Sequence, residues 1–332
     1  MKRTLAIAAL LATAWFGSVS AQELDAVDQI RLREAFRLME ASAPRWKGWE
    51  AAPSPVLLVV KDHEFFVGHS RPEEDFTPLD IASIEGRDVF VRERVFAPNL
   101  LATFPAVDGI PTIVIGTPEA TGLSSTRWVV TLVHEHFHQL QMSQPDYFRS
   151  VDRLDLSGGD DTGMWMLNYP FPYSAEQVAA EVNRLGAMAS SLVQSLERGV
   201  TDEDALAVYL SQRRAVEDIL APRDFRYFSF QLWQEGLARH AEVDAALHAS
   251  EVFEFSSEFR DLPDYEPLSR VVAEIRDRTL AELDSDVSES GRFYFYALGA
   301  TEGEILDVMR PGWRGRYLSE PFAVHDYFEP GP

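Results

Sequence analysis

Residues 134 to 138 read His-Glu-His-Phe-His, and three of the eight histidines of the chain fall within this pentapeptide. His134 and His138 are four residues apart, so on a helix their imidazoles project from one face, one turn above the other. Two neutral imidazoles at that separation can bind one Zn²⁺, and Glu135 then lies beside the metal. There it can take a proton from water that the metal activates. The pattern predicts a hydrolytic metal site.

A catalytic zinc needs three protein ligands and an open position, so the pentapeptide lacks one ligand. His136 does not serve, because residues two apart point to different sides of a helix; we expect it to pack or to face solvent. The residues after His138 lack the Gly and the further His of the metzincin continuation. The chain contains no cysteine, so the missing ligand must be a histidine or a carboxylate.

The segment from Trp233 to Glu242 reads Trp-Gln-Glu-Gly-Leu-Ala-Arg-His-Ala-Glu. It resembles the Asn-Glu-Gly-Phe/Leu-Ala-x-Tyr-x-Glu helix of the gluzincin metallopeptidases, the M1 aminopeptidase-like and thermolysin-like clan. The resemblance implies that Glu235 is the third zinc ligand and that Glu242 is the second acidic residue of that helix. Seven residues are close to two helical turns, so Glu242 shares the face of Glu235. We expect it to contact a ligand histidine as an outer-shell partner, without binding the metal itself.

The rest of the resemblance is partial. The gap from His138 to Glu235 is longer than in the best-known members, which implies inserted helices. The Gly-Ala-Met-Glu-Asn signature of the aminopeptidases is absent, so amino-terminal specificity does not carry over. The run Phe-Tyr-Phe-Tyr-Ala-Leu-Gly at 293–299 is similar to the Tyr-x-x-Gly segment of M1-like enzymes. It implies that Tyr296, or else Tyr294, donates a hydrogen bond to the oxyanion.

Structural alternatives stay open for each of these residues. His134 and His138 would also suit a polar stripe on a partly buried helix. Glu235 would also suit a surface pair with Arg239 at i+4, and the two tyrosines would suit a hydrophobic core. The aromatic-rich stretch 165–173 either walls a substrate cleft or simply packs.

The N-terminus has the features of a signal peptide. Lys2 and Arg3 are basic, 4–16 is almost wholly apolar, and small residues lead to Ala21. The apolar stretch is too short to span a bilayer, and no cysteine follows it for a lipid anchor. We therefore expect cleavage near Ala21 and a secreted or periplasmic protein without stable membrane insertion after cleavage.

The formal net charge is −23. A surface this acidic repels phosphate backbones, which argues against a nucleic-acid partner. The absence of cysteine means that stability must come from a large core and not from disulfides. Composition carries no signal of an oligomeric state.

Hydrophobic periodicity predicts an α+β protein. Strand-like runs at 56–60, 64–67, 88–92 and 113–115 follow a helix at 24–46, and 145–175 reads as a loop. Later periodic stretches are helical, at 175–198, 202–220, 224–249, 267–283 and 294–309. Beyond the signal peptide at 1–21, we expect a mixed α/β N-terminal lobe at 22–150 that ends in the motif helix, and a mainly helical C-terminal lobe at 151–332. The resemblance implies a zincin-like fold with the active-site cleft between the lobes.

The expected function is an exported zinc-dependent hydrolase of the gluzincin type. It would be a metallopeptidase that cleaves a peptide or protein substrate, with Glu135 assisting the attack of water at the zinc. Two alternatives remain. One is a degenerate zincin that acts as a secreted binding or accessory protein, and the other is a zinc hydrolase of non-peptide amides or esters.

Overall fold

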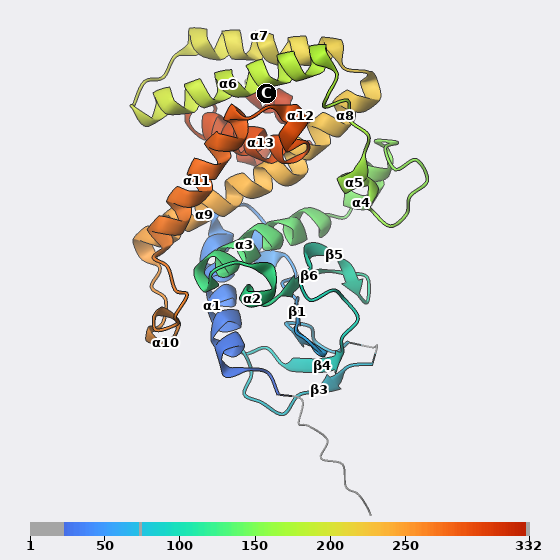
Figure 1. Ribbon diagram of the computed structural model, residues 1–332, viewed down its shortest axis with the longest axis vertical. Helices are drawn as coiled ribbons and strands as arrows, with labels where there is room; N and C mark the ends of the chain where they lie inside the picture. Colours follow the sequence, from blue (N-terminus) through green and yellow to red (C-terminus); the bar gives the residue numbers. More distant parts are fainter. Residues whose placement is uncertain (1–22, 73–74, 330–332) are drawn as a thin grey trace, which may run out of the picture.

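The computed structural model describes residues 23–72 and 75–329 (Figure 1). The signal peptide predicted at 1–21 lies outside the described residues. Within the described ranges, no helix is both long and apolar enough to cross a membrane. The chain is a mixed α+β protein in which one sheet is accompanied by many helices, which confirms the predicted fold class at this level.

The sheet contains six strands in the described residues, in the order β3-β4-β2-β1-β6-β5. β1 and β6 are parallel, and the other neighbours are antiparallel. The four predicted strands are present as β1, β2, β4 and β6, whereas β3 and β5 were not predicted. The strands are β1 (Val56–Val59), β2 (His63–Val67), β3 (Thr77–Pro78), β4 (Val89–Glu93), β5 (Leu101–Val107) and β6 (Ile110–Gly116).

β5 escaped prediction because its sequence, Leu-Ala-Thr-Phe-Pro-Ala-Val, contains a proline in its interior. Proline cannot donate to a strand ladder, so it is confined to edge strands and bulges. β5 is the last strand of the sheet, and its register against β6 shifts between Phe104 and Val107. Edge position and irregular pairing together accommodate Pro105.

Alternate residues of the central strands enter two different cores. Val56 and Leu58 of β1 face the helices and belong to the main hydrophobic core. Leu57 and Val59 face the other way, into a smaller cluster that Phe96 and Phe104 help to cover. Both faces of the sheet are therefore buried, which explains why β1 reads as a continuous apolar run rather than an alternating one.

The helices come mostly after the sheet. Between the two motifs lie the helices that the long gap from His138 to Glu235 implied, and the region 145–175 contains two short ones. The helices are α1 (Ala26–Ser42), α2 (Pro118–Thr121), α3 (Ser125–Met142), α4 (Tyr147–Asp152), α5 (Trp165–Asn168), α6 (Glu176–Glu197), α7 (Glu203–Ile219), α8 (Pro222–Gln231), α9 (Leu237–Val252), α10 (Ser257–Arg260), α11 (Leu268–Asp284), α12 (Val287–Ser290) and α13 (Phe293–Met309).

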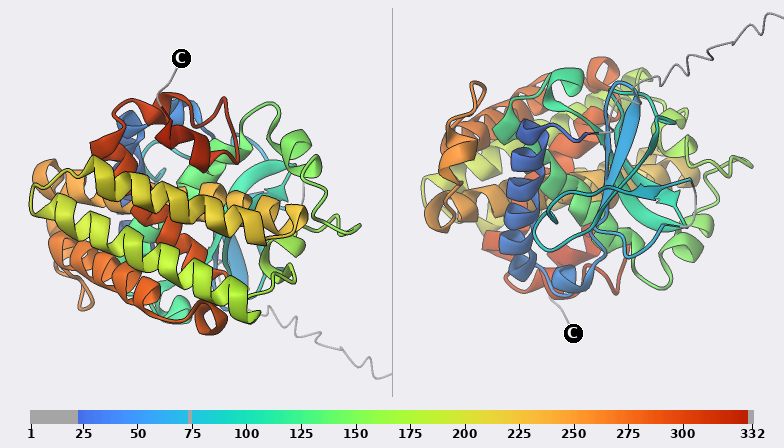
Figure 2. Two further views of the ribbon diagram at one scale, coloured as in Figure 1. Left: turned by 90° about the horizontal axis from the view of Figure 1, so that it is seen from above. Right: turned by 90° about the horizontal axis from the view of Figure 1, so that it is seen from below.

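The elements are stacked along the long axis of the molecule (Figure 1). The sheet lies at one end, and α6 and α7 lie side by side at the other, as the view from above shows (Figure 2). α3 packs on β5 and β6 with one side and on α9 with the other. One hydrophobic core runs through this stack, from Leu24 to Phe328. The helix with the pentapeptide is thus at the centre of the molecule.

Candidate metal centre

α3 carries the pentapeptide and begins where the sequence provides a cap. The Ser124 hydroxyl accepts a hydrogen bond from the Arg127 amide over 3.3 Å, as expected of an N-cap serine. Most of α3 is buried, because it lies between the sheet and α9. On the side that meets α9, His134 and His138 stand one turn apart, with ring centroids 4.8 Å from each other.

Glu235 lies in an irregular turn between α8 and α9. Sequence periodicity predicted one continuous helix over 224–249, but the structure interrupts it with a π-helical segment, η3 (Leu232–Gly236). The Leu237 amide donates to the Leu232 carbonyl, five residues back, in place of the usual four. Such π-turns are frequent at functional sites because they shift the direction of a side chain within an otherwise regular helix.

The structure brings His134, His138 and Glu235 together. One ligand atom from each lies within 4.8 Å of the others. Glu235 Oε2 is 3.3 Å from His138 Nε2 and 3.7 Å from His134 Nε2, and the two Nε2 atoms are 3.1 Å apart. Two ligand nitrogens at about 2.0–2.1 Å from one tetrahedral zinc would be separated by about 3.3 Å. The spacing of the residues therefore fits a shared ion.

Gln141 determines which nitrogen of His138 is free. Its amide nitrogen donates to the backbone carbonyls of Trp233 and Gln234, at 3.3 and 2.9 Å. Its carbonyl oxygen therefore faces His138 Nδ1, at 2.7 Å. The Gln234 amide nitrogen also lies 3.1 Å from this Nδ1. The Gln141 oxygen is closer, and because an amide oxygen only accepts, it favours a proton on Nδ1. Nε2 then faces Glu235, and in the neutral imidazole its lone pair is free to bind a metal ion.

Glu242 has the same relation to His134. Its Oε2 is 3.5 Å from His134 Nδ1, and its Oε1 is 2.8 Å from the Arg127 guanidinium. Burial raises the pKa of Glu242, but the charges of Arg127 and His134 outweigh burial and lower it to about 2. Glu242 is therefore a carboxylate that orients the Nδ1–H group of His134 and leaves Nε2 free to bind a metal ion.

The cluster as a whole favours a positive charge. Burial opposes protonation of His134, but hydrogen bonds to Glu235 and Glu242 outweigh it and raise the pKa of His134 to about 10. Likewise, burial would raise the pKa of Glu235, yet the charges of His138 and His134 hold it well below its usual range. Two carboxylates around two imidazoles attract a cation, which is either a proton or a metal ion.

Glu135 lies beside this cluster and is held from the sheet. The Thr103 hydroxyl on β5 donates to its Oε2 over 2.7 Å. Glu135 is 4% exposed as a residue, and among the described residues the other oxygen of its carboxylate has no hydrogen-bond partner. One oxygen is thus fixed in position while the second remains available to a proton donor.

The two candidate tyrosines lie in different places. Burial and the charge of the neighbouring Glu235 raise the pKa of Tyr296 well above its usual value, so its hydroxyl stays protonated beside the cluster. Tyr294 is fully buried, and its hydroxyl lies 3.4 Å from the carbonyls of Val182 and Leu283. It fills space over Gly186 of α6. Of these two tyrosines, only Tyr296 is therefore adjacent to a candidate ligand.

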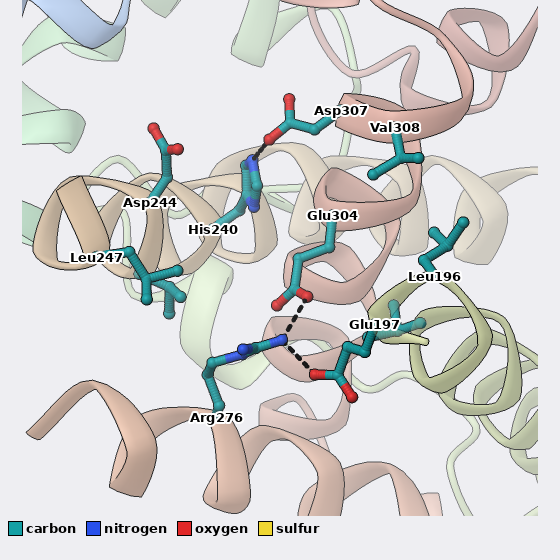
Figure 3. A pocket seen from close by; sticks show the side chains of 11 residues that line it. Leu196, Glu197, His240, Asp244, Leu247, Arg276, Glu304, Asp307 and Val308 are labelled. Atoms are coloured by element: carbon teal, nitrogen blue, oxygen red, sulfur yellow. Dashed lines mark hydrogen bonds and ion pairs between the residues drawn. The ribbon is translucent and has the colours of Figure 1, made fainter. Parts of the chain in front are cut away.

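His136 and His240 have structural surroundings. The His136 ring stacks on Trp49 at 5.5 Å, and its Nδ1 contacts the amide oxygen of Gln139, so it is a packing residue as expected. His240 Nε2 lies 2.9 Å from Asp307. It lines a pocket of about 270 Å³, where Arg276 bridges two glutamates (Figure 3). This pocket contains none of the three candidate ligand residues.

Apart from Glu242, the residues that hydrogen-bond to the candidate ligands and to Glu135 were not predicted from the sequence. Gln141 follows His138 by three positions, so helical spacing alone could have suggested it. Thr103 and Arg127 had no such signal, because their partners come from other elements of the fold.

Comparison with known protein families, curated proteins and solved structures finds no match to this chain.

Proposed function

We propose that this protein is an exported, zinc-dependent peptidase of the gluzincin type with a zincin-like fold. The observation that carries the proposal is the convergence of His134, His138 and Glu235, two imidazoles and a carboxylate, with Glu135 adjacent in sequence to the first ligand. Three protein ligands of this kind match catalytic zinc sites, since structural zinc sites usually have four. Zinc would lower the pKa of a water molecule and polarise a carbonyl group.

The residues of the chain have separate roles in this proposal. Glu135 acts as the general base on the attacking water and returns the proton to the leaving amine nitrogen. The hydroxyl of Tyr296 donates to the oxyanion that develops on the attacked carbonyl. Thr103 holds one oxygen of Glu135 and keeps the other oriented toward the water.

A peptide is the substrate that the surroundings favour. β5 is the last strand of the sheet, and it contacts the Glu135 side chain through Thr103. An extended peptide can pair with the free edge of such a strand through main-chain hydrogen bonds. Pairing along β5 would bring successive peptide carbonyls past Glu135, which supports a peptide rather than a compact ester.

The first test separates chemistry from metal binding. Glu135→Gln should abolish hydrolysis of a mixed peptide library, by at least about a hundredfold, because the general base is lost. Its zinc content, measured by mass spectrometry, should equal that of the unmodified protein. Full activity in the variant would remove Glu135 from the mechanism. Bound zinc without any turnover in the unmodified protein would favour a binding role instead.

The second part of the test concerns the third ligand. Glu235→Ala should lower zinc affinity sharply, since two imidazoles alone make a weak site. Glu251→Ala removes an exposed carboxylate from α9, the helix that follows η3, and should leave zinc affinity unchanged. Tightly bound stoichiometric zinc in the Glu235 variant would contradict the assignment.

A further inference from the structure

Arg292 lies next to the candidate oxyanion donor. It precedes α13, and its Nη1 donates to the Tyr296 hydroxyl over 2.7 Å. The guanidinium carbon is 4.5 Å from the centre of the Phe293 ring and 5.7 Å from that of Tyr296. Tyr296 in turn neighbours Glu235. The Tyr296 side chain therefore lies between Arg292 and Glu235, one of the three proposed metal ligands.

The charge of Arg292 has no carboxylate partner in the part of the chain that the structure describes. Among the described residues, no aspartate or glutamate lies within ion-pair distance of it, whereas the nearby Arg239 binds Glu282. None of its remaining N–H groups is a buried donor without a partner, so they reach solvent. An unpaired arginine beside a candidate active site is notable in a chain with a net charge of −23.

Aromatic residues surround this guanidinium. Its charge acts on Tyr173 and Tyr227, because it lowers the pKa of each against the opposing effect of burial. Tyr173 belongs to the aromatic-rich stretch that the sequence suggested as a cleft wall. Rings around a cation reduce its hydration, and a carboxylate then binds more strongly than it would at an open surface. The surroundings suit a planar anion.

We propose that Arg292 binds the C-terminal carboxylate of the substrate, so that the enzyme releases single residues from the C-terminus of peptides. This inference rests on the proposed function. Successive residues are 3.80 Å apart along a chain. A carbonyl oxygen bound to the Tyr296 hydroxyl and a carboxylate bound to Arg292 would therefore be held about one residue apart, because the two protein groups are 2.7 Å from each other. Water adds to the carbonyl carbon, the C–N bond breaks, and the amino group of the released residue takes the proton.

Binding to an inactive variant tests this assignment without turnover. Zinc-loaded Glu135→Gln protein is titrated with an N-acetylated, fluorescently labelled tetrapeptide, either as the free acid or as the C-terminal amide. The free acid should bind at least tenfold more tightly, because only a carboxylate accepts two charge-assisted hydrogen bonds from one guanidinium. In Glu135→Gln/Arg292→Gln the difference should disappear, and in Glu135→Gln/Arg292→Lys part of it should remain. Equal binding of acid and amide by the Glu135→Gln protein would overturn the proposal.

Turnover distinguishes failure of this inference from failure of the proposed function. The otherwise unmodified enzyme should release the C-terminal residue of the free acid, and Arg292→Gln should lower kcat/KM for the acid at least tenfold with little change for the amide. Arg270→Gln, which removes an exposed arginine on α11, should preserve the preference for the acid. Efficient internal cleavage of peptides blocked at both ends, with no acid preference, would contradict the role of Arg292 and leave the peptidase assignment standing. Zinc binding without cleavage of any peptide would overturn both.

Discussion

At the scale of single residues, the site depends on hydrogen bonds that select one nitrogen of each imidazole. Gln141 contacts His138 Nδ1 and also joins α3 to η3, through the carbonyls of Trp233 and Gln234. Glu242 contacts His134 Nδ1 and is itself held by Arg127. In both cases the Nε2 atom is left to meet Glu235. A ligand histidine with the opposite tautomer would present an N–H group where a lone pair is needed.

Gln141→Met should weaken zinc binding about 10- to 100-fold, which is the usual effect of losing a partner that orients a ligand histidine. The variant keeps the volume of the side chain but leaves His138 without its acceptor. Gln139→Met is the matched control, because Gln139 is an equally buried amide of α3 that contacts His136 and two backbone carbonyls of the sheet region. Competition titration with a zinc chelator measures the zinc affinity of both variants. Equal losses in the two variants would show that Gln141 acts only through stability.

At the scale of elements, the direction of Glu235 depends on how α13 crosses η3. The two glycines at the crossing are in direct contact: a Cβ atom on Gly236 would lie 2.5 Å from Gly299 Cα. The same close approach brings Tyr296, one turn before Gly299, next to Glu235. The partial Tyr-x-x-Gly resemblance thus has a packing reason in this chain, because the glycine lets the tyrosine approach Glu235, the candidate third ligand.

Gly299→Ala should therefore disturb both packing and chemistry. Its Cβ would lie 2.7 Å from the Gly236 Cα and from the Leu232 carbonyl oxygen, so α13 must move away from η3. We expect a loss of about 1–3 kcal/mol in the free energy of unfolding, together with reduced turnover as Tyr296 retreats. Gly315→Ala, where nothing lies within 4 Å of the new methyl group, serves as the control for urea unfolding. Unchanged stability of Gly299→Ala would mean that the crossing tolerates side chains.

At the scale of the whole molecule, segments far apart in the chain are joined by a partly buried ionic network. Asp244 on α9 binds Arg45 near the N-terminus and Arg314 near the C-terminus. Arg314 also binds Asp307 of α13, which contacts His240. Burial opposes the charge of Asp307, but His240 and Arg314 outweigh it and hold its pKa well below its usual range. The network connects Arg45 and Arg314 to α9, which follows η3 directly, and to α13, which carries Tyr296.

Asp307→Asn should lower the free energy of unfolding by about 1–3 kcal/mol at pH 7, as expected for lost hydrogen bonds to charged groups. The folded-state pKa of Asp307 is depressed, so its contribution is complete above the unfolded value of about 3.9 and is lost as the pH falls toward the folded value. The difference between the two proteins should therefore shrink between pH 7 and pH 3 in urea unfolding. Asp277→Asn, at an exposed position of α11, should show no difference at either pH. A pH-independent loss would indicate that packing, not charge, is responsible.

The sequence by itself determined the local features of this protein. Helical spacing is a property of neighbouring residues, so it could place His134, Glu135 and His138 on one turn, and apolar periodicity could place the core strands and long helices. It did not predict β5, whose proline is acceptable only at a sheet edge, or the π-turn at η3, which regular periodicity conceals.

Only the tertiary structure decided how the distant parts meet. Glu235 approaches the two histidines because α9 packs on α3, and Thr103 reaches Glu135 because β5 lies beside the same helix. The choice of ring nitrogen, the unpaired charge of Arg292 and the separation of Tyr296 from Tyr294 likewise depend on partners from other elements. These contacts are set by packing across the whole chain, which residue spacing does not encode.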